Sequence, residues 1–205
     1  MTAMASTGAA AFLGRFEGLR MRLPGARTAW IDALREAAAE AFRAQGFPTR
    51  RAEAWRYTDL AAVTGAAFGV PLTSVDDLPD MPPAQAPRAV FLDGRYRPDL
   101  STLDASGFTA TSLAEALPHL EGRLGAIARP EEHPMAALNG MLFAEGLLID
   151  IPAGVAAGTI ELLSIVAASE RAPAFHPRHL VRLGAGASLT LIERCIGPAG
   201  RYLHN

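Results

Sequence analysis

Histidines, acidic residues and one cysteine are the side chains of this sequence that could bind a metal ion or act as nucleophiles. Two short clusters contain histidine: HPRH with His176 and His179, and EEH with Glu131, Glu132 and His133. Imidazoles and carboxylates are common zinc ligands, but both clusters lie beside prolines and neither has a third ligand at a usual spacing. We therefore interpret these histidines as structural or solvated, and the sequence predicts no metal site.

Cys195 is the only cysteine of the sequence, so no internal disulfide can form and an oxidising compartment is not indicated. It lies between Ile192 and Ile196 in LIERCIG, and this apolar setting predicts a buried, unreactive thiol. The stretch LGAGASL at 183–189 lacks the GxGxxG spacing and is not followed by a helix pattern. The sequence contains no Ser-His-Asp pattern, nucleophile elbow or Walker loop, and we predict no catalytic residues.

Arginines and aromatic residues are concentrated in GFPTRRAEAWRYTDL, residues 46–60. Such a run can stack on nucleic acid and neutralise it, but this one contains acidic residues and the chain has a net charge of −2. We favour a capped helical turn that begins at Thr49, packs Trp55 and Tyr57 inward and pairs Arg with Glu along its rim. The turn would fix the helical region against the β part or against a partner. The residues of this predicted structural and interaction anchor are Arg50, Arg51, Glu53, Trp55, Tyr57 and Asp59.

Two helices are expected before this anchor. Apolar residues recur at helical spacing over residues 12–19, and Pro24-Gly25 ends that segment. A second helix is predicted from Thr28, as its N-cap, to Gln45, with Gly46 in the position after the helix that favours glycine. Its apolar stripe should contain Trp30, Leu34, Ala37, Ala38, Ala41 and Phe42, and its polar side Arg35, Glu36, Glu40 and Arg43.

Strand signals follow a stretch rich in proline, glycine and small residues at 64–87, which we interpret as a linker. The segment RAVFLDGRYRPDLS at 88–101 predicts a strand, a turn at Asp93-Gly94 and a second strand. The segment TSLAEALPHL at 111–120 predicts a short helix.

The sequence also repeats itself at an offset of 32 residues. LLIDIPAGV at 147–155 aligns with HLVRLGAGA at 179–187, and each copy leads into another apolar, β-rich run. Repeated strand–turn–strand units favour a solenoid in which successive coils stack. Because no capping segment follows RYLHN at 201–205, we expect the chain to be the N-terminal part of a longer protein.

The composition is that of a soluble globular protein, with half of the residues hydrophobic and a fifth charged. A net charge of −2 gives no strong attraction for nucleic acid or anionic membranes. Residues 1–16 lack the basic start of a signal peptide, and the apolar stretch 141–168 is interrupted by acidic residues and a proline. The cytoplasm is the expected location.

The run GFPTRRAEAWRYTDL resembles the N-terminal signature of the SufB/SufD family of the SUF iron–sulfur cluster assembly system, in particular its SufD branch. The segments VFLDGRYRPDLS at 90–101, HPMAALNGMLFAEGLLIDIPAGV at 133–155 and PRHLVRLGAGASLTLIERCIG at 177–197 support the resemblance. It covers most of residues 28–205, in the order and spacing of the family.

The resemblance implies a helical N-terminal region, then a right-handed parallel β-helix, then a C-terminal helical region that this sequence does not contain. It implies a non-catalytic scaffold subunit that pairs with a SufB-like paralogue and a SufC-like ATPase. Apart from the resemblance, the open strand edge of the final coil allows a homodimer through the β-helix. An iron–sulfur cluster and a reduced flavin are implied for the whole complex only. Cys195 matches no cluster ligand of the family.

The predicted fold class is α+β: an N-terminal helical region followed by the start of a right-handed parallel β-helix. Its segments would be a helical region over 1–63, the linker over 64–87, a mixed strand and helix segment over 88–132, and the first β-helix coils over 133–205. A rival hypothesis is a β-helical enzyme that acts on carbohydrate or acyl substrates in a groove along the coils. Its candidate residues would be Asp150, Glu161, Glu193 and His179.

Overall fold

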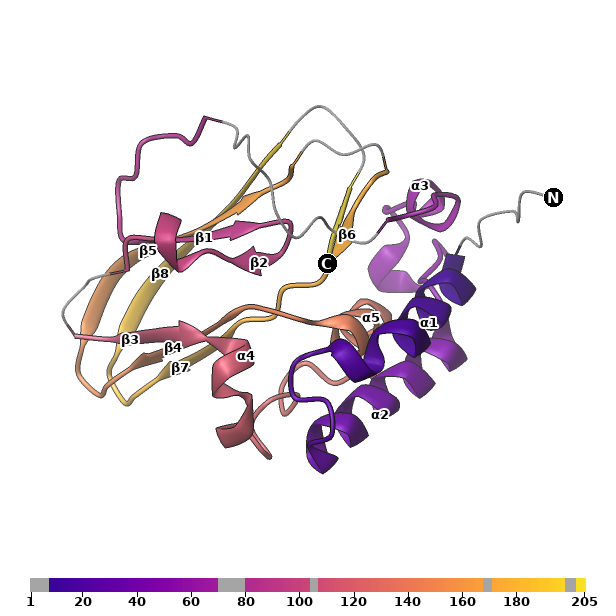
Figure 1. Cartoon of the computed structure of the whole chain (residues 1–205), viewed down its shortest axis with the longest axis horizontal. Helices are drawn as coiled ribbons and strands as arrows, with labels where there is room; N and C mark the ends of the chain where they lie inside the picture. The colour runs from indigo at the N-terminus through magenta and orange to yellow at the C-terminus, as the bar shows by residue number, and fades with distance from the viewer. Residues whose placement is uncertain (1–7, 70–79, 104–106, 168–170, 198–201) are drawn as a thin grey trace. The chain divides into compact units, whose positions relative to one another are not determined.

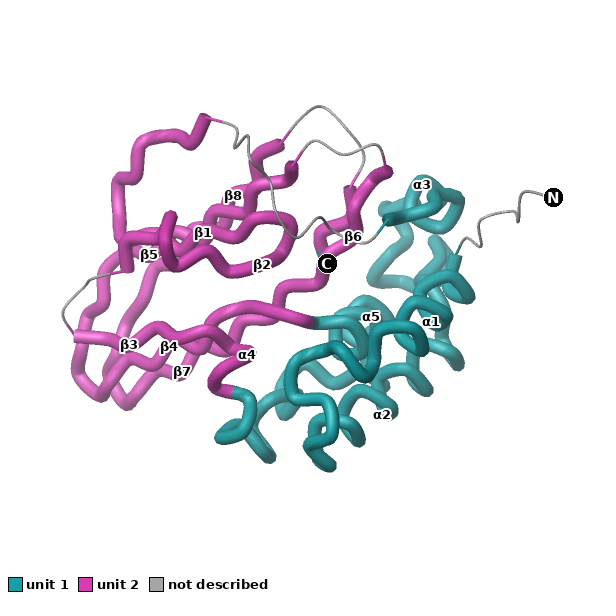
Figure 2. The backbone as a smooth tube through the Cα atoms, viewed as in Figure 1, with its two compact units in different colours: residues 1–69, 117–143, 205 teal, residues 70–116, 144–204 magenta. Residues whose placement is uncertain are grey.

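The computed structural model describes residues 8–69, 80–103, 107–167, 171–197 and 202–205. The chain is a mixed α+β structure, with helices in its first part and sheets later (Figure 1). It divides into two compact units made of separated stretches: residues 1–69, 117–143 and 205 form unit 1, and residues 70–116 and 144–204 form unit 2 (Figure 2). Within the described ranges, no helix has both the length and the apolar character needed to cross a membrane.

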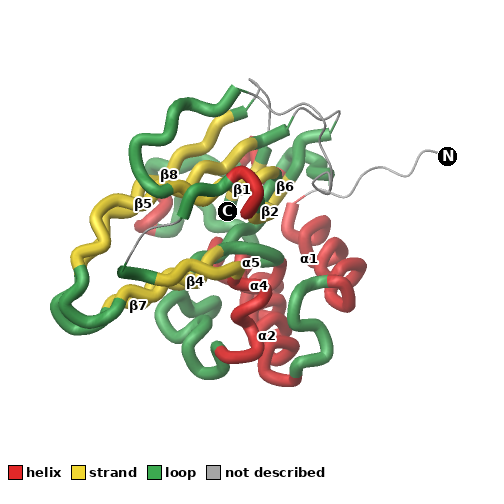
Figure 3. Tube along the Cα trace, turned by 60° about the vertical axis from the view of Figure 1, so that its left-hand side comes forward, coloured by secondary structure: helices red, strands yellow, loops and turns green. Residues whose placement is uncertain are grey.

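Unit 1 is helical, as the red segments of Figure 3 show. As predicted, α2 begins directly after Thr28 and ends before Gly46, although the Thr28 side chain makes no capping hydrogen bond. Gly46 has a φ of +65°, and its N–H donates to the Phe42 carbonyl over 2.8 Å. The elements of this unit are α1 (Gly8–Leu19), η1 (Arg20–Arg22), α2 (Ala29–Gln45), η2 (Glu53–Trp55), α3 (Ala61–Thr64), η4 (Leu117–His119) and α5 (Pro134–Leu142).

The core of unit 1 forms where α1 and α5 pack against α2. Phe12 and Phe16 of α1 are buried, as their spacing predicts. Phe47 lies edge-on to both Phe12 and Phe42, with ring centroids 5.6 and 5.2 Å apart. Edge-to-face pairs of this kind stabilise a core by about 0.5–1.5 kcal/mol beyond the area they bury.

The buried face of α2 differs from the predicted stripe in one important residue. Arg35, expected on the polar side, is only 1% exposed, whereas Ala37 is exposed and Trp30 is half-buried. The Arg35 guanidinium is satisfied by backbone carbonyls and an aromatic ring of its own unit, so burial does not leave it without partners. The residues of α2 that are buried are Ile31, Arg35, Ala38, Ala39 and Phe42.

Unit 2 contains all the named strands and two short helical elements (Figure 3). The strands form three sheets, in the orders β2-β1-β5-β8, β3-β4-β7 and β6-β9. Their bounds are β1 (Arg88–Leu92), β2 (Arg95–Tyr96), β3 (Thr109–Ser112), β4 (Leu147–Ile151), β5 (Ala156–Ile165), β6 (Ala174–Phe175), β7 (Leu180–Leu183), β8 (Ser188–Ile196) and β9 (Leu203–His204). The helical elements are η3 (Pro98–Leu100) and α4 (Leu113–Ala116).

The predicted hairpin at the start of this unit is confirmed. Strands β1 and β2 are antiparallel, and Leu92 pairs with Arg95 across a two-residue turn. Asp93 and Gly94 both have positive φ, +47° and +79°. Positive φ at both central positions is what a type I′ hairpin turn requires, and Asp-Gly is a favoured pair for it.

The 32-residue repeat appears in the strand pairing. Strand β4 pairs in parallel with β7, and the register joins Leu148 to Leu180, which confirms the offset inferred from the sequence. Strands β5 and β8 begin their parallel pairing at the same offset, Ala156 with Ser188, and a register shift reduces the offset to 31 residues from Thr159 with Thr190 onward. Strand β6 pairs in parallel with β9. Strand β1 covers the other side of β5, and β3 covers the other side of β4. Among the described residues, β7, β8 and β9 are paired on one side only.

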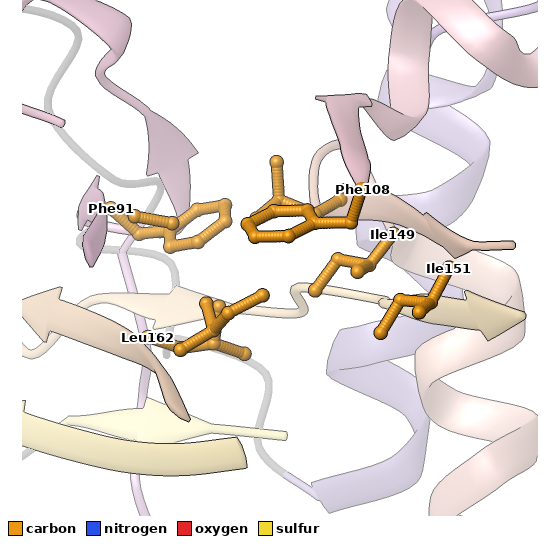
Figure 4. Close-up of a cluster of buried hydrophobic side chains, with 8 residues drawn as sticks. Phe91, Phe108, Ile149, Ile151 and Leu162 are labelled. Carbon is orange, nitrogen blue, oxygen red and sulfur yellow. The ribbon is translucent and has the colours of Figure 1, made fainter. Parts of the chain in front are cut away.

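Apolar side chains from β1, β4 and β5 meet in the main core of unit 2. In Figure 4 the labelled side chains of Phe91, Phe108, Ile149, Ile151 and Leu162 point toward one another. Fully burying such a side chain stabilises the fold by about 1.5–3 kcal/mol. Side chains on the opposite face of β1 and β5, together with a residue just after β5, form a second buried cluster. It consists of Val90, Leu92, Leu163, Ile165 and Ala167.

Two elements were not expected. Residues 134–142 fall in the segment predicted to form the first coils, but they form the helix α5 of unit 1. Residues 109–112 form strand β3, so Thr111 and Ser112, the first two residues of the predicted short helix, lie in a sheet instead. The predicted linker over 64–87 begins at the end of α3, and its residues 70–79 lie outside the described residues. The predicted segments are continuous in sequence, whereas both compact units are made of separated stretches. The predicted segment boundaries therefore stay a prediction.

Candidate interaction and ligand sites

The predicted anchor lies between α2 and α3, and we call residues 49–60 the arginine–aromatic segment. Its turn begins as expected, because the Ala52 N–H donates to the Thr49 carbonyl over 2.9 Å. The expected rim pair is present as well, with Arg56 Nη1 3.0 Å from Glu53 Oε1. The carboxylate of Asp59 accepts a 2.8 Å hydrogen bond from the backbone N–H of Ala61, the first residue of α3.

The prediction that both aromatic rings of this segment pack inward is wrong. Tyr57 is 88% exposed, and Trp55 is half-buried. The aromatic interior of unit 1 is made of phenylalanines instead. The Tyr57 ring lies beside the Arg56 guanidinium, whose central carbon is 5.1 Å from the centroid of the ring. The other predicted anchor residues, Arg50, Arg51, Glu53 and Asp59, are all exposed.

A buried ion pair joins β1 to β5 in unit 2. Arg88 Nε lies 2.7 Å from Glu161 Oε2, and both side chains are 6% exposed. Arg194 of β8 lies 3.3 Å from the second carboxylate oxygen. The Arg88 guanidinium also donates to the carbonyls of Pro82 and Pro83, over 2.7 and 3.0 Å. This network holds three strands and the segment before β1 together. It gives the Arg88 guanidinium acceptors for its N–H groups, without which its buried charge would be costly.

His179 acts as a hydrogen-bond acceptor between the two repeats. Its Nδ1 accepts the backbone N–H of Leu147 over 3.1 Å, and its ring lies edge-on to Phe91, with centroids 5.2 Å apart. Burial, and next the charge of nearby His204, lower the pKa of His179 to about 4. The imidazole is therefore neutral near pH 7, as this acceptor role requires, and the structural interpretation of His179 holds.

Four polar side chains of β8, β9 and the residue before β9 lie near one another. His204 Nε2 is 3.7 Å from Glu193 Oε1, and burial lowers the pKa of His204. Tyr202 lies near Cys195, whose thiol raises the pKa of the phenol. The thiol is exposed, so the prediction of a buried cysteine is wrong. The reason is that β8 has a paired neighbour on one side only within the described residues, which leaves its side chains open to solvent.

The candidate residues of the rival enzyme hypothesis are engaged in separate contacts. Glu161 pairs with two arginines, Asp150 pairs with Arg182, Glu193 faces a histidine, and His179 accepts a backbone N–H. The EEH cluster of residues 131–133 is exposed, and one of its glutamates pairs with Arg129. Across the described parts of the chain, no three His, Cys, Asp or Glu side chains are placed to hold a metal ion together.

Sequence reasoning missed three buried polar residues. Arg35, Arg88 and Asp93 are 1%, 5% and 1% exposed. Asp93 accepts the backbone N–H of Ala167 over 2.9 Å and so ties the hairpin turn to the end of β5. Each of these residues makes at least one contact more than 70 residues away along the chain. A single sequence carries no local signal for such partners.

The polar groups described above hold strands, turns and helices in place. The class indicated is an α+β chain built from helices and a repeat of parallel strands. The family described as "SufBD protein N-terminal region" matches residues 9–160. The chain therefore belongs to the SufB/SufD family, whose members take part in SUF iron–sulfur cluster assembly. None of the curated proteins matches it.

Proposed function

We propose that this chain is a SufD-type scaffold subunit of the SUF machinery, with a SufB-like paralogue and a SufC-like ATPase as its partners. The observation that carries the family part of the proposal is the match over residues 9–160, and the SufD assignment rests on the resemblance of residues 46–60 to the SufD branch. The parallel repeat extends beyond the matched range, to β9. The iron–sulfur cluster is the cargo of the assembled complex in this proposal, and no residue of this chain is assigned to it or to a flavin.

The three parallel pairs support a β-helix as the architecture of the second half. Strands β4, β5 and β6 are followed in the same order by β7, β8 and β9, and each pairs in parallel with its counterpart. Two successive coils of a β-helix would give this pattern, with one strand of each coil on each face. Parallel connections are right-handed in nearly all proteins, which favours a right-handed coil.

A stacked coil of this kind suits a subunit that transmits force and lies against other proteins. Strands β7 and β8 carry apolar side chains at their open side, with Leu183 52%, Leu191 41% and Ile192 40% exposed. An unpaired strand edge with apolar side chains accepts further strands, either from a paralogue or from a second copy of this chain. Two stiff coils side by side would carry a nucleotide-driven movement of the ATPase to a cluster site between them.

Co-expression with the candidate partners tests the proposal. We expect the chain to purify together with the SufB-like protein and the SufC-like ATPase encoded by the same host. Pairing with a SufD-like paralogue instead would identify the chain as the SufB-type subunit of the family. Recovery of a clean monomer, free of either partner, would count against a scaffold role.

Complementation separates the two family branches in cells. A SufD-type subunit should restore iron–sulfur enzyme activity in a host strain that lacks SufD and leave a strain that lacks SufB unrescued. The matched comparison is the same plasmid with the host's own SufD or SufB. Rescue of only the SufB-deficient strain would overturn the SufD assignment.

A further inference from the structure

We infer that the arginine–aromatic segment is a docking site for a carboxylate-rich segment of another protein. The inference goes beyond the scaffold role, because it names a surface in the helical unit and the chemistry of what binds there. It does not depend on which protein of the assembly machinery the partner is.

The aromatic rings of this segment are not part of the buried core of unit 1. Tyr57 is 88% exposed although it is large and partly apolar, and Trp55 is half-buried. Tyrosine, tryptophan and arginine are the residues most enriched at the energetic centres of protein interfaces. A short turn that presents all three together therefore has the composition of a binding surface.

The charges of the segment favour an acidic partner. Its two carboxylates are already engaged, Glu53 with Arg56 and Asp59 with the N–H of Ala61. Within the described residues, neither Arg50 nor Arg51 has a carboxylate at ion-pair distance. Both side chains are exposed, although Arg50 Nε already donates to the Arg56 carbonyl over 3.3 Å. An exposed guanidinium can bind a carboxylate with two hydrogen bonds, which is the geometry that arginine favours.

Unit 1 as a whole also carries more positive than negative side chains. Unit 1 contains eleven arginines and nine acidic residues, whereas unit 2 contains eight arginines and twelve acidic residues. The net charge of −2 for the chain thus combines a positive unit with a negative one. Long-range attraction between a positive surface and an acidic partner speeds encounter and fixes orientation.

A protein fits this surface better than a nucleic acid does. Glu53 is exposed, with 86% of its side chain accessible, and would lie close to any phosphate backbone bound by the neighbouring arginines. A phosphate backbone carries a charge at every nucleotide, and three arginines interspersed with two acidic residues match so dense a row of charges poorly. A protein segment can place its carboxylates at the arginines and apolar groups on the tyrosine ring.

Photo-cross-linking in the full chain tests the inference. Tyr57→p-benzoylphenylalanine places a photoreactive ring at the centre of the segment, in cells of the native host. Ile127→p-benzoylphenylalanine is the matched control, because Ile127 belongs to the same unit and is 89% exposed. We expect a protein adduct from position 57, at least tenfold above the control, whose cross-linked peptide is rich in Asp and Glu when mapped by mass spectrometry.

Charge reversal then tests the recognition chemistry. The double substitution Arg50→Glu and Arg51→Glu should reduce the adduct at least tenfold, and reversing the acidic residues of the mapped peptide should restore it. Arg123→Glu is the control, since Arg123 is an exposed arginine elsewhere in unit 1. Far-UV circular dichroism of the purified double variant must match that of the wild type.

Four results would overturn the inference. These are an adduct to unit 2 of the same chain, an adduct to nucleic acid, yields equal to the Ile127 control, and an adduct that survives charge reversal. The first would mean that the segment joins the two units of one molecule. A mapped acidic partner from outside the SUF machinery would uphold the docking site and contradict the proposed function, so the two ideas fail separately.

Discussion

Two buried arginines show different ways of stabilising a charge inside this protein. Arg88 has a carboxylate partner in Glu161, whereas the Arg35 guanidinium donates to the carbonyls of Met141, Phe143 and Pro24, over 3.3, 2.9 and 3.1 Å. The Phe143 ring lies 4.0 Å from the Arg35 guanidinium carbon. Arg35 thus joins α2 to the end of α5 and to the turn before α2.

We predict that Arg35→Met destabilises the protein by about 2–4 kcal/mol, because it leaves three inward-facing carbonyls without their donor. The measurement is chemical denaturation followed by circular dichroism. Arg43→Met, at an exposed position near the end of α2, should change the free energy of unfolding by less than about 0.5 kcal/mol. Equal midpoints for the two variants would show that the Arg35 contacts contribute nothing to stability.

His179 should make stability depend on pH in a defined window. Its pKa falls from the ordinary 6.5 to about 4 on folding, so between these values the unfolded chain binds more protons than the folded one. Its contribution is complete above pH 6.5 and is lost as the pH falls toward 4, at up to about 1.4 kcal/mol per pH unit. The lowered pKa of His204 acts in the same direction, while burial raises the pKa of Glu145 and opposes it at the acidic end.

Denaturation at several pH values between 4 and 7 checks this prediction against His179→Asn, whose side-chain oxygen can still accept the Leu147 N–H. The wild type should lose more stability than the variant as the pH falls. Parallel curves for both proteins would contradict the assignment of this pH dependence to His179.

At the scale of elements, the sequence predicts what local chemistry determines. The ends of α2, the Asp93-Gly94 hairpin and the 32-residue repeat all follow from residues within or beside the element. The buried face of α2 does not, because apolar periodicity cannot detect an arginine whose acceptors lie more than 100 residues away. Strand β3 is equally hidden, since its partner β4 follows a long intervening stretch.

The same limit applies to the candidate sites. The composition of the arginine–aromatic segment is visible in the sequence, and so is its Arg56–Glu53 rim pair, at a spacing of three residues. The exposure of Tyr57 and Cys195 is not visible in the sequence, because it depends on which residues the fold places beside them.

Close stacking of the two repeats depends on a glycine at the turn of the second repeat. A Cβ on Gly184 would lie 2.7 Å from Ala153 Cα, against the backbone of the preceding turn. Gly184→Ala should therefore lower the melting temperature well below that of Gly186→Ala. Gly186 has a φ of +71° but open space around it, so alanine there should cost only about 1–2 kcal/mol of conformational strain.

Differential scanning calorimetry of both variants checks this prediction, and each is compared with the wild type. A larger loss for Gly186→Ala than for Gly184→Ala would mean that the turns of successive repeats do not pack as closely as described.

At the scale of the whole molecule, the interleaving of the two units makes stable fragments hard to obtain. Helix α2 packs on α5, which the chain reaches only after the first stretch of unit 2, residues 70–116. We predict that residues 1–69 alone are largely unfolded, because they leave α2 without α5 and Arg35 without its acceptors at Met141 and Phe143. Residues 1–143, which include α5, should recover helical circular dichroism and a cooperative thermal transition. A cooperative transition in the 1–69 fragment would refute this prediction.

Interleaving also has a consequence for synthesis on the ribosome. Helices α1 and α2 leave the exit tunnel first and can pack on each other, but the side of α2 that packs on α5 stays uncovered until α5 has emerged, more than 80 residues later. At ordinary elongation rates of about 5–20 residues per second, this apolar surface waits for several seconds. The early helices are therefore a natural binding target for chaperones that act on nascent chains.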